Sequence, residues 1–183
     1  MKKMMKEIRS WVFSIGLALV LAMMIGVFVF QPTEVLGHSM DPTLQDQQRI
    51  YVSKLSHTFN YEPEYGDIVI IDSRVDRERT FKDDLLDNPL IRLFQDAEEG
   101  RNYVKRVIGK PGDVLEFRDH KVYRNGEELQ EPYIKEAMLY TSDEKLVVPD
   151  EHVFVMGDNR NNSKDSRQIG FIPLSHVLGK KIF

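Results

Sequence analysis

Residues 103–126, YVKRVIGKPGDVLEFRDHKVYRNG, decide the fold class that we predict for this chain. The stretch contains three short runs rich in Val, Ile, Phe and Tyr, namely Tyr103–Ile108, Asp113–Phe117 and Lys121–Tyr123. Turn-forming residues separate the runs, and Asn125-Gly126 after the third is a dipeptide that favours a type I′ hairpin. Short runs of this composition between tight turns predict antiparallel strands.

Similar runs lie on both sides of this stretch, at Gln48–Ser53, Asp67–Asp72 and Glu151–Met156. We therefore predict a mainly β fold built on an antiparallel sheet. Residues 73–100 mix charged and apolar side chains, which predicts a surface loop or a short amphipathic helix near residues 88–95. Pro89 limits where that helix can begin.

A candidate membrane span precedes these runs. The twenty residues from Trp11 to Phe30 carry no charge, and about twenty helical residues cross the hydrocarbon core of a bilayer. A cleavable signal peptide is the alternative, but its apolar region is usually about 7 to 15 residues long, and Val35-Leu36-Gly37 is a weak cleavage site. The basic residues before the span, which place the N-terminus in the cytoplasm, are Lys2, Lys3, Lys6 and Arg9.

The chain is therefore predicted to consist of one anchor and one outward-facing domain. Residues 1–31 form the cytoplasmic N-terminus and the transmembrane helix, and residues 32–183 form an extracytoplasmic domain large enough for a core of its own. Residues 115–145 are a candidate small β subdomain within it.

The composition excludes several classes of site. The chain of 183 residues has no cysteine, so disulfides, thiolate zinc sites and a cysteine nucleophile are excluded. A net charge of −4 gives no general electrostatic reason to bind nucleic acid, and we predict no such partner. We also predict no metal and no cofactor. Residues 157–170 resemble a calcium loop only loosely, because the twelve-residue spacing with a terminal glutamate is missing.

Ser39, in the block Gly37–Leu44 (GHSMDPTL), is the candidate nucleophile. It follows the predicted span by nine residue steps, and an extended chain covers at most about 3.3 to 3.6 Å per residue, so Ser39 stays within about 30 Å of the span. A serine hydroxyl needs an adjacent base to attack at neutral pH. His38 would point away from Ser39 on an extended chain, and no local motif places His152 or His176 beside it.

Lys105 is the other candidate base. Alternation along its strand puts it on one face with Tyr103 and Val107, where burial would lower its pKa. A fall from about 10.4 to about 8 corresponds to roughly 3 kcal/mol, at about 1.36 kcal/mol per unit. The alternative, which the pattern alone favours, places Lys105 at the exposed end of an edge strand with Arg106 buried against a carboxylate.

A third block, residues 157–170 (GDNRNNSKDSRQIG), combines turn formers, charges and two hydroxyls. Together with Gly37–Leu44, Gly66–Val69 and Lys105–Asp113, it forms an ordered set behind an N-terminal span that resembles the type I signal peptidases. The resemblance covers nearly the whole chain, and four blocks in the family's order are far more specific than any one of them. It implies a signal-peptidase-like antiparallel catalytic domain behind one N-terminal transmembrane helix.

The resemblance implies a Ser/Lys dyad in place of the usual triad. Ser39 matches the family nucleophile, and Lys105 matches its general base. Ser163 matches the hydroxyl that hydrogen-bonds and orients the lysine amine. The charged residues that the resemblance implies as structural support for the site are Asp158, Asp165, Arg167 and Arg106.

Three positions around the nucleophile also follow from the resemblance. Met40 and Pro42 match substrate-facing or membrane-facing positions. The alternatives without a role in catalysis are a core methionine for Met40 and a turn-capping serine for Ser163. Some members carry a serine two residues before the nucleophile, whose hydroxyl helps to bind the oxyanion. This chain has Gly37 there and lacks a side-chain donor, so we expect the backbone amide of Ser39 to serve. An oxyanion donor is worth about 3 to 4 kcal/mol.

The implied activity is that of a single-pass, membrane-bound serine endopeptidase of the cell membrane. It removes signal peptides from exported precursor proteins through an acyl-enzyme intermediate, so its partners are those precursors and the lipid bilayer. One alternative is a self-cleaving, repressor-type Ser/Lys protease, against which the span and residues 157–170 argue. The other is an inactive, peptide-binding relative, against which the presence of both Ser39 and Lys105 argues.

Overall fold

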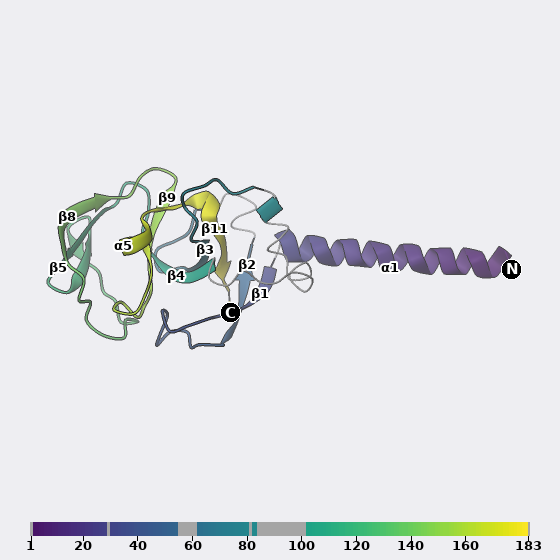
Figure 1. Cartoon of the computed structure of the whole chain (residues 1–183), viewed down its shortest axis with the longest axis horizontal. Coiled ribbons are helices and arrows are strands. Elements are labelled where there is room, and N and C mark those ends of the chain that lie inside the picture. Colours follow the sequence, from purple (N-terminus) through teal and green to yellow (C-terminus); the bar gives the residue numbers. More distant parts are fainter. Residues whose placement is uncertain (1, 29, 55–61, 81, 84–101, 183) are drawn as a thin grey trace.

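The structure is a computed structural model and describes residues 2–28, 30–54, 62–80, 82–83 and 102–182. Figure 1 shows a long N-terminal helix, α1 (Lys2–Phe28), that projects away from a β-rich body. The strands of the described residues form two sheets, and all of their pairings are antiparallel. The predicted mainly β, antiparallel fold is confirmed.

The larger sheet has seven strands in the order β1-β2-β11-β3-β4-β9-β10 within the described residues. Their bounds are Phe30–Glu34 (β1), Arg49–Ser53 (β2), Ile68–Asp72 (β3), Asn102–Gly109 (β4), His152–Met156 (β9), Ile172–Pro173 (β10) and Val177–Lys181 (β11). Strands β2, β3, β4 and β9 match the predicted runs to within one residue at each end. A 3-10 turn, Leu174–His176, leads into β11.

Strand β4 is internal to this sheet. Lys105 pairs with Val69 of β3, while Arg106 pairs with Ile68 of β3 on one side and with Met156 of β9 on the other. The alternative that placed Lys105 at the end of an edge strand is therefore wrong. Its second half, a buried Arg106 paired with a carboxylate, is nevertheless correct.

The smaller sheet has the order β7-β6-β5-β8 within the described residues. Its strands are Val114–Arg118 (β5), Lys121–Arg124 (β6), Glu127–Glu128 (β7) and Ser142–Val147 (β8). Asn125 and Gly126 join β6 to β7 with φ angles of 54° and 86°, the left-handed conformation that a type I′ turn requires. This sheet covers the region of the candidate subdomain 115–145, whose status as a separate unit stays a prediction.

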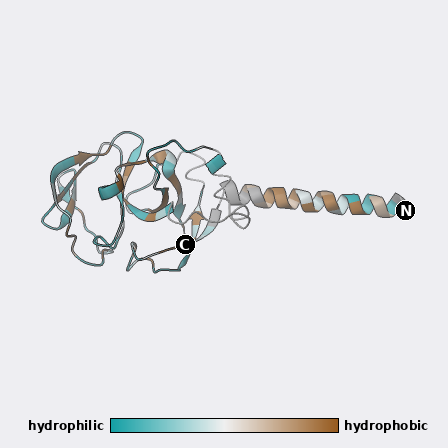
Figure 2. Cartoon of the chain, viewed as in Figure 1, coloured by the Kyte–Doolittle hydropathy of each residue, from teal (hydrophilic) through white to brown (hydrophobic). Residues whose placement is uncertain are grey.

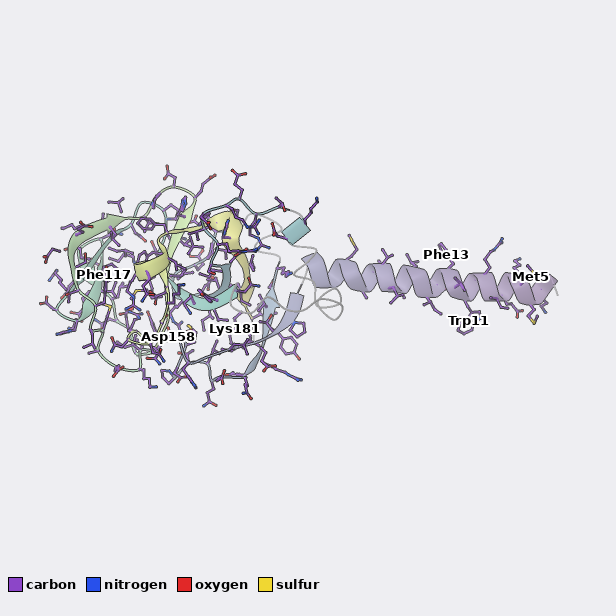
Figure 3. All side chains as sticks on the ribbon, viewed as in Figure 1. Met5, Trp11, Phe13, Phe117, Asp158 and Lys181 are labelled. Atoms are coloured by element: carbon purple, nitrogen blue, oxygen red, sulfur yellow. The ribbon has the colours of Figure 1, made fainter. Side chains whose placement is uncertain are left out.

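One hydrophobic cluster connects the two sheets. Its buried members are Ile108, Leu115, Phe117, Val122, Met138, Val148, Phe154 and Met156. Phe117 of β5, labelled in Figure 3, lies against Phe154 of β9 with ring centroids 5.6 Å apart. Because β4, β5, β6 and β9 all contribute, the two sheets share one core.

Helix α1 exposes large apolar side chains along its described part, among them Trp11 and Phe13 (Figure 3). Figure 2 shows hydrophobic segments along the same helix. Nevertheless, in the part of the chain that the structure describes, no helix is both long enough and apolar enough to cross a membrane. The structure therefore does not confirm the predicted N-terminal span. The helix predicted near residues 88–95 lies outside the described residues.

Candidate active site

Ser39 and Lys105 meet beside the larger sheet. The turn that carries Ser39 follows β1 and is fixed to the sheet by an apolar cluster of Val35, Met40, Leu44, Ile50, Val52, Ile70 and Leu178. Lys105 extends from β4, and its Nζ lies 2.7 Å from Ser39 Oγ. This distance is within the hydrogen-bond reach that a nucleophile and its base require. Two residues 66 positions apart in the sequence are thus brought into contact.

Lys105 is buried, with 2% of its surface exposed. Its Nζ donates to the carbonyl of Val104 at 2.9 Å and lies 5.3 Å from the ring centroid of Tyr103. Burial lowers the pKa of Lys105 to about 8, because loss of water disfavours the ammonium form. A substantial fraction of the amine is therefore neutral near pH 8, and its lone pair can accept the proton of Ser39.

Two buried carboxylates near Lys105 each have an arginine partner. Arg106 donates to Asp158 from Nε at 2.8 Å and from Nη2 at 2.6 Å. Arg167 donates to Asp165 from Nε at 2.8 Å and from Nη2 at 2.7 Å. Asp165 and Asp158 raise the pKa of Lys105 and Arg167 lowers it. Arg167 therefore offsets part of the negative charge that would otherwise hold Lys105 as ammonium.

The Arg106–Asp158 pair connects the four sequence blocks. Arg106 Nη1 also donates to the carbonyl of Gly66 at 2.8 Å, and Thr43 Oγ1 donates to Asp158 Oδ2 at 2.5 Å. Figure 3 shows Asp158 within the β-rich body, far from the free end of α1. One buried ion pair thus binds the Ser39 turn, the start of β3, strand β4 and the loop after β9 to each other.

The loop after β9 also holds the backbone of the nucleophile. Asn159 donates to the Ser39 carbonyl from its amide at 3.0 Å and to the His38 carbonyl from Nδ2 at 2.9 Å. A Cβ atom on Gly157 would lie 2.4 Å from the Ser39 carbonyl oxygen and 2.3 Å from Ser163 Oγ, so only glycine fits. Neither Gly157 nor Asn159 was predicted as a site residue, because a glycine and an asparagine in a turn-rich block carry no signal of their own.

The hydrogen bond predicted between Ser163 and the Lys105 amine is not seen. Ser163 Oγ is buried and has no hydrogen-bond partner within the described part of the chain. Ser163 Oγ lies beside the Ser39 backbone, because a Cβ atom placed on Gly157 would be close to Ser163 Oγ and also to the Ser39 carbonyl oxygen. The orienting role of Ser163 stays a prediction.

Comparison with known proteins places this site in a family. The family model described as signal peptidase, peptidase S26, matches residues 8–183. The chain belongs to the signal peptidase S26 family. A probable signal peptidase I-1 from Synechocystis sp. is 39% identical over 166 residues, covering 91% of this chain and 76% of that protein. Signal peptidase I from Bacillus licheniformis is 39% identical over 186 residues, covering 95% and 86%.

A crystal structure of a signal peptidase I from Enterococcus faecalis also matches, with 30% identity and a TM-score of 0.46. The match covers 65% of this chain and 96% of that one. Membership of the signal peptidase S26 family makes this chain a serine endopeptidase, and hence a hydrolase.

The family resemblance predicted that Met40 and Pro42 face the substrate or the membrane, and the structure separates the two residues by their exposure. Met40 is fully buried in the apolar cluster beneath the Ser39 turn, so its prediction as a surface-facing residue is wrong. An unbranched, apolar side chain at this position fixes the turn to the sheet. Pro42 is exposed, and its role stays a prediction.

The family's oxyanion position is occupied by Gly37, as the sequence indicates. Its φ angle of 83° lies in the left-handed region that favours glycine, and its amide donates to Asp46 Oδ1 at 2.7 Å. The Gly37 amide is therefore already paired with Asp46. Among the hydrogen bonds of the described residues, none is donated by the Ser39 backbone amide, which leaves that amide available.

The histidines considered as alternative bases lie elsewhere. His152 Nδ1 is 2.7 Å from the carbonyl of Asp150, and the buried His176 has Nδ1 3.3 Å from the carbonyl of Asp72. Neither pairs with Ser39 in the described part of the chain. Lys105 is the residue whose amine the structure places against Ser39 Oγ.

Proposed function

We propose that the chain is a membrane-bound serine endopeptidase that removes signal peptides from exported precursor proteins by a Ser39–Lys105 dyad. The observation that carries this proposal is the 2.7 Å contact between Ser39 Oγ and the Nζ of a buried lysine whose pKa is lowered to about 8. The names of the relatives, signal peptidase I, support the choice of precursors as substrates.

The reaction we propose is acyl transfer in two steps. Neutral Lys105 takes the hydroxyl proton while Ser39 Oγ attacks the carbonyl carbon of the scissile bond. Lys105 then gives that proton to the leaving amine, which departs as the new N-terminus of the mature chain. In the second step, Lys105 takes a proton from water as the water attacks the acyl-enzyme carbonyl. The Ser39 Oγ–acyl bond then breaks, Lys105 returns the proton to Ser39 Oγ, and the signal peptide leaves with a free carboxylate.

Developing negative charge on the carbonyl oxygen needs a hydrogen-bond donor. The Ser39 backbone amide is proposed for this role, because it donates no hydrogen bond to any group of the described residues. Ser163 is proposed to orient the Lys105 amine, since its Oγ is buried, has no hydrogen-bond partner in the described residues and lies beside the Ser39 backbone. Arg106, Asp158, Asp165 and Arg167 are proposed to support the dyad through their buried ion pairs.

A membrane anchor would bring enzyme and substrate together. Trp11 to Phe30 carries no charge, and Lys2, Lys3, Lys6 and Arg9 precede it, which supports a cytoplasmic N-terminus. We propose residues 1–31 as N-terminus and anchor, and residues 32–183 as the extracytoplasmic catalytic domain. Signal peptides lie in the same bilayer, so anchoring raises the effective concentration of the cleavage site near Ser39.

The precursor would bind as an extended strand. We propose that the segment before the scissile bond pairs with backbone flanking Ser39 and with the Tyr103–Lys105 part of β4, with small side chains in shallow pockets at alternate positions. Pro42, which is exposed near Ser39, is proposed to face substrate or membrane.

Cleavage of a model precursor in detergent tests this function. The intact chain is expected to release the signal peptide at one bond, and Ser39→Ala and Lys105→Ala are each expected to lower kcat/KM more than about 1,000-fold. Lys145→Ala, an exposed lysine on β8, is the matched control and should keep full activity. Full processing by Lys105→Ala would show that the dyad is wrong.

A further inference from the structure

A cavity of about 430 Å³ has Ser163, a neighbour of the Ser39 backbone, in its wall. It is formed by the loop after β9 and by residues just before β8, and its walls include Leu139, Ser163, Lys164, Arg167 and Gln168. None of the steps described above uses this cavity.

Ser163 relates the cavity to the nucleophile, because it lines the cavity and its Oγ lies close to the Ser39 backbone. Ser163 Oγ and the Ser39 carbonyl oxygen lie 2.3 Å and 2.4 Å from one point, the position of a Cβ atom on Gly157. Ser39 thus has two flanks, one formed by Tyr103–Lys105 and the other by Gly157 and Ser163. Since the first is assigned to the peptide before the scissile bond, the second is the side on which the peptide after that bond would leave.

The cavity walls are fixed by hydrogen bonds and ring contacts. Asn161 accepts from the amide of Leu139 at 2.9 Å and donates to the carbonyl of Ala137 at 3.0 Å. Arg167, held by Asp165, also lies 5.7 Å from the ring centroid of Tyr140. A wall that is already ordered loses little conformational freedom when a peptide binds.

The walls carry positive charge. Arg160, Lys164 and Arg167 line the cavity, and none of the described residues in its wall is acidic. Arg160 is paired with Glu131 and Arg167 with Asp165, so their charges are largely offset. Lys164 is exposed and has no ion-pair or hydrogen-bond partner among the described residues. Its ammonium group is available to a negatively charged ligand.

We propose that this cavity binds the first residues of the mature chain after the scissile bond and that Lys164 gives it a preference for an acidic side chain there. The proposal rests on the proposed function. An extended peptide advances about 3.3 Å per residue, so its second or third residue after the bond lies about 7 to 10 Å beyond the reacting carbonyl. Lys164 directly follows Ser163 in the chain, which places it within reach of that residue.

Steady-state cleavage of matched precursors tests the proposal. Three substrates differ only in carrying Asp, Asn or Lys at the third position after the scissile bond, and a fourth carries Asp three positions before it. They are compared with the intact chain, with Lys164→Glu and with Lys145→Glu, which places the same change on exposed β8. KM and kcat are measured separately at low and high salt.

The intact chain is expected to cleave the Asp substrate with a KM roughly two- to five-fold below that of the Lys substrate, the size of one exposed charge interaction. Lys164→Glu should reverse this order, Lys145→Glu should keep it, and high salt should remove it. kcat should stay within about two-fold throughout.

Two results would overturn the proposal. One is an equal charge preference in Lys164→Glu and Lys145→Glu, and the other is an effect of Lys164→Glu on the substrate with Asp before the bond. With either result, the proposed function still stands if the precursors are cleaved and if the cleavage requires Ser39. If the intact chain cleaves none of the four precursors, the proposed function itself fails.

Discussion

At the level of single residues, the surroundings of Lys105 determine whether Ser39 can be activated. An exposed lysine is protonated at neutral pH and has no lone pair with which to accept a proton. Lys105 is buried, pairs with Val69 of β3 and contacts Ser39, and its neighbouring carboxylates are held by Arg106 and Arg167. Burial therefore lowers the pKa of Lys105 by more than the carboxylates raise it, and the pKa falls below its ordinary value.

The pH dependence of kcat/KM follows from this pKa. Protonated Lys105 is inactive as a base, so activity should rise with pH, reach half of its plateau near pH 8 and fall about 100-fold by pH 6. Arg167→Gln should shift the midpoint to higher pH, because Arg167 lowers the pKa of Lys105. A profile measured on a model precursor that stays flat between pH 6 and pH 9 would rule out a lysine base with this pKa.

At the level of secondary-structure elements, the Arg106–Asp158 pair joins β3, β4, the Ser39 turn and the loop after β9. Both side chains are buried, and Thr43 and Gly66 supply the further hydrogen bonds. A buried ion pair is strongly destabilising when one partner is removed, because the other charge remains without compensation.

Asp158→Ala is therefore expected to lower the free energy of unfolding by about 3 to 5 kcal/mol. Glu128→Ala, which removes an exposed pair with Lys121 in the smaller sheet, is the matched control and should leave stability unchanged within error. Denaturant unfolding in detergent measures both variants. Equal stability of Asp158→Ala and the intact chain would show that the pair does not hold these elements together.

Strands whose residues have strong β propensity could be predicted from sequence, but β11 could not. Its sequence, VLGKK, is short and contains Gly179, and a glycine weakens a strand signal. The structure explains this glycine, because a Cβ there would lie 2.5 Å from the carbonyl oxygen of Ser53 in β2. The four-residue helix α5 (Ser166–Ile169) is too short to show helical periodicity.

The dyad shows a second limit of sequence reasoning. From the pattern around Lys105 alone, an exposed position on an edge strand was favoured. Lys105 meets Ser39, which is 66 positions away in the chain, so only the resemblance of several blocks together predicted a base at that position. For Met40, the alternative of a core methionine is correct, and the cluster that buries it includes β2, β3 and β11.

At the level of the whole molecule, a helix with exposed apolar side chains extends from a body whose two sheets share one core (Figure 1). If α1 is the proposed anchor, a charge at its centre should weaken membrane insertion by roughly 2.5 to 3.5 kcal/mol. Val20→Arg is expected to increase the fraction released from membranes by an alkaline carbonate wash. Val147→Arg, the same change at an exposed position of β8, should not. Equal release of the two variants would contradict the anchor.

The central claim is that Ser39 is a nucleophile activated by Lys105. Mass spectrometry tests it most directly, on the full chain after reaction at pH 8 with a peptidyl ester that acylates the enzyme and is hydrolysed slowly. We predict a single acyl adduct on Ser39, none on Ser39→Ala, and acylation slowed more than about 1,000-fold in Lys105→Met. An adduct on a different residue, or acylation of Lys105→Met at the rate of the intact chain, would contradict the claim.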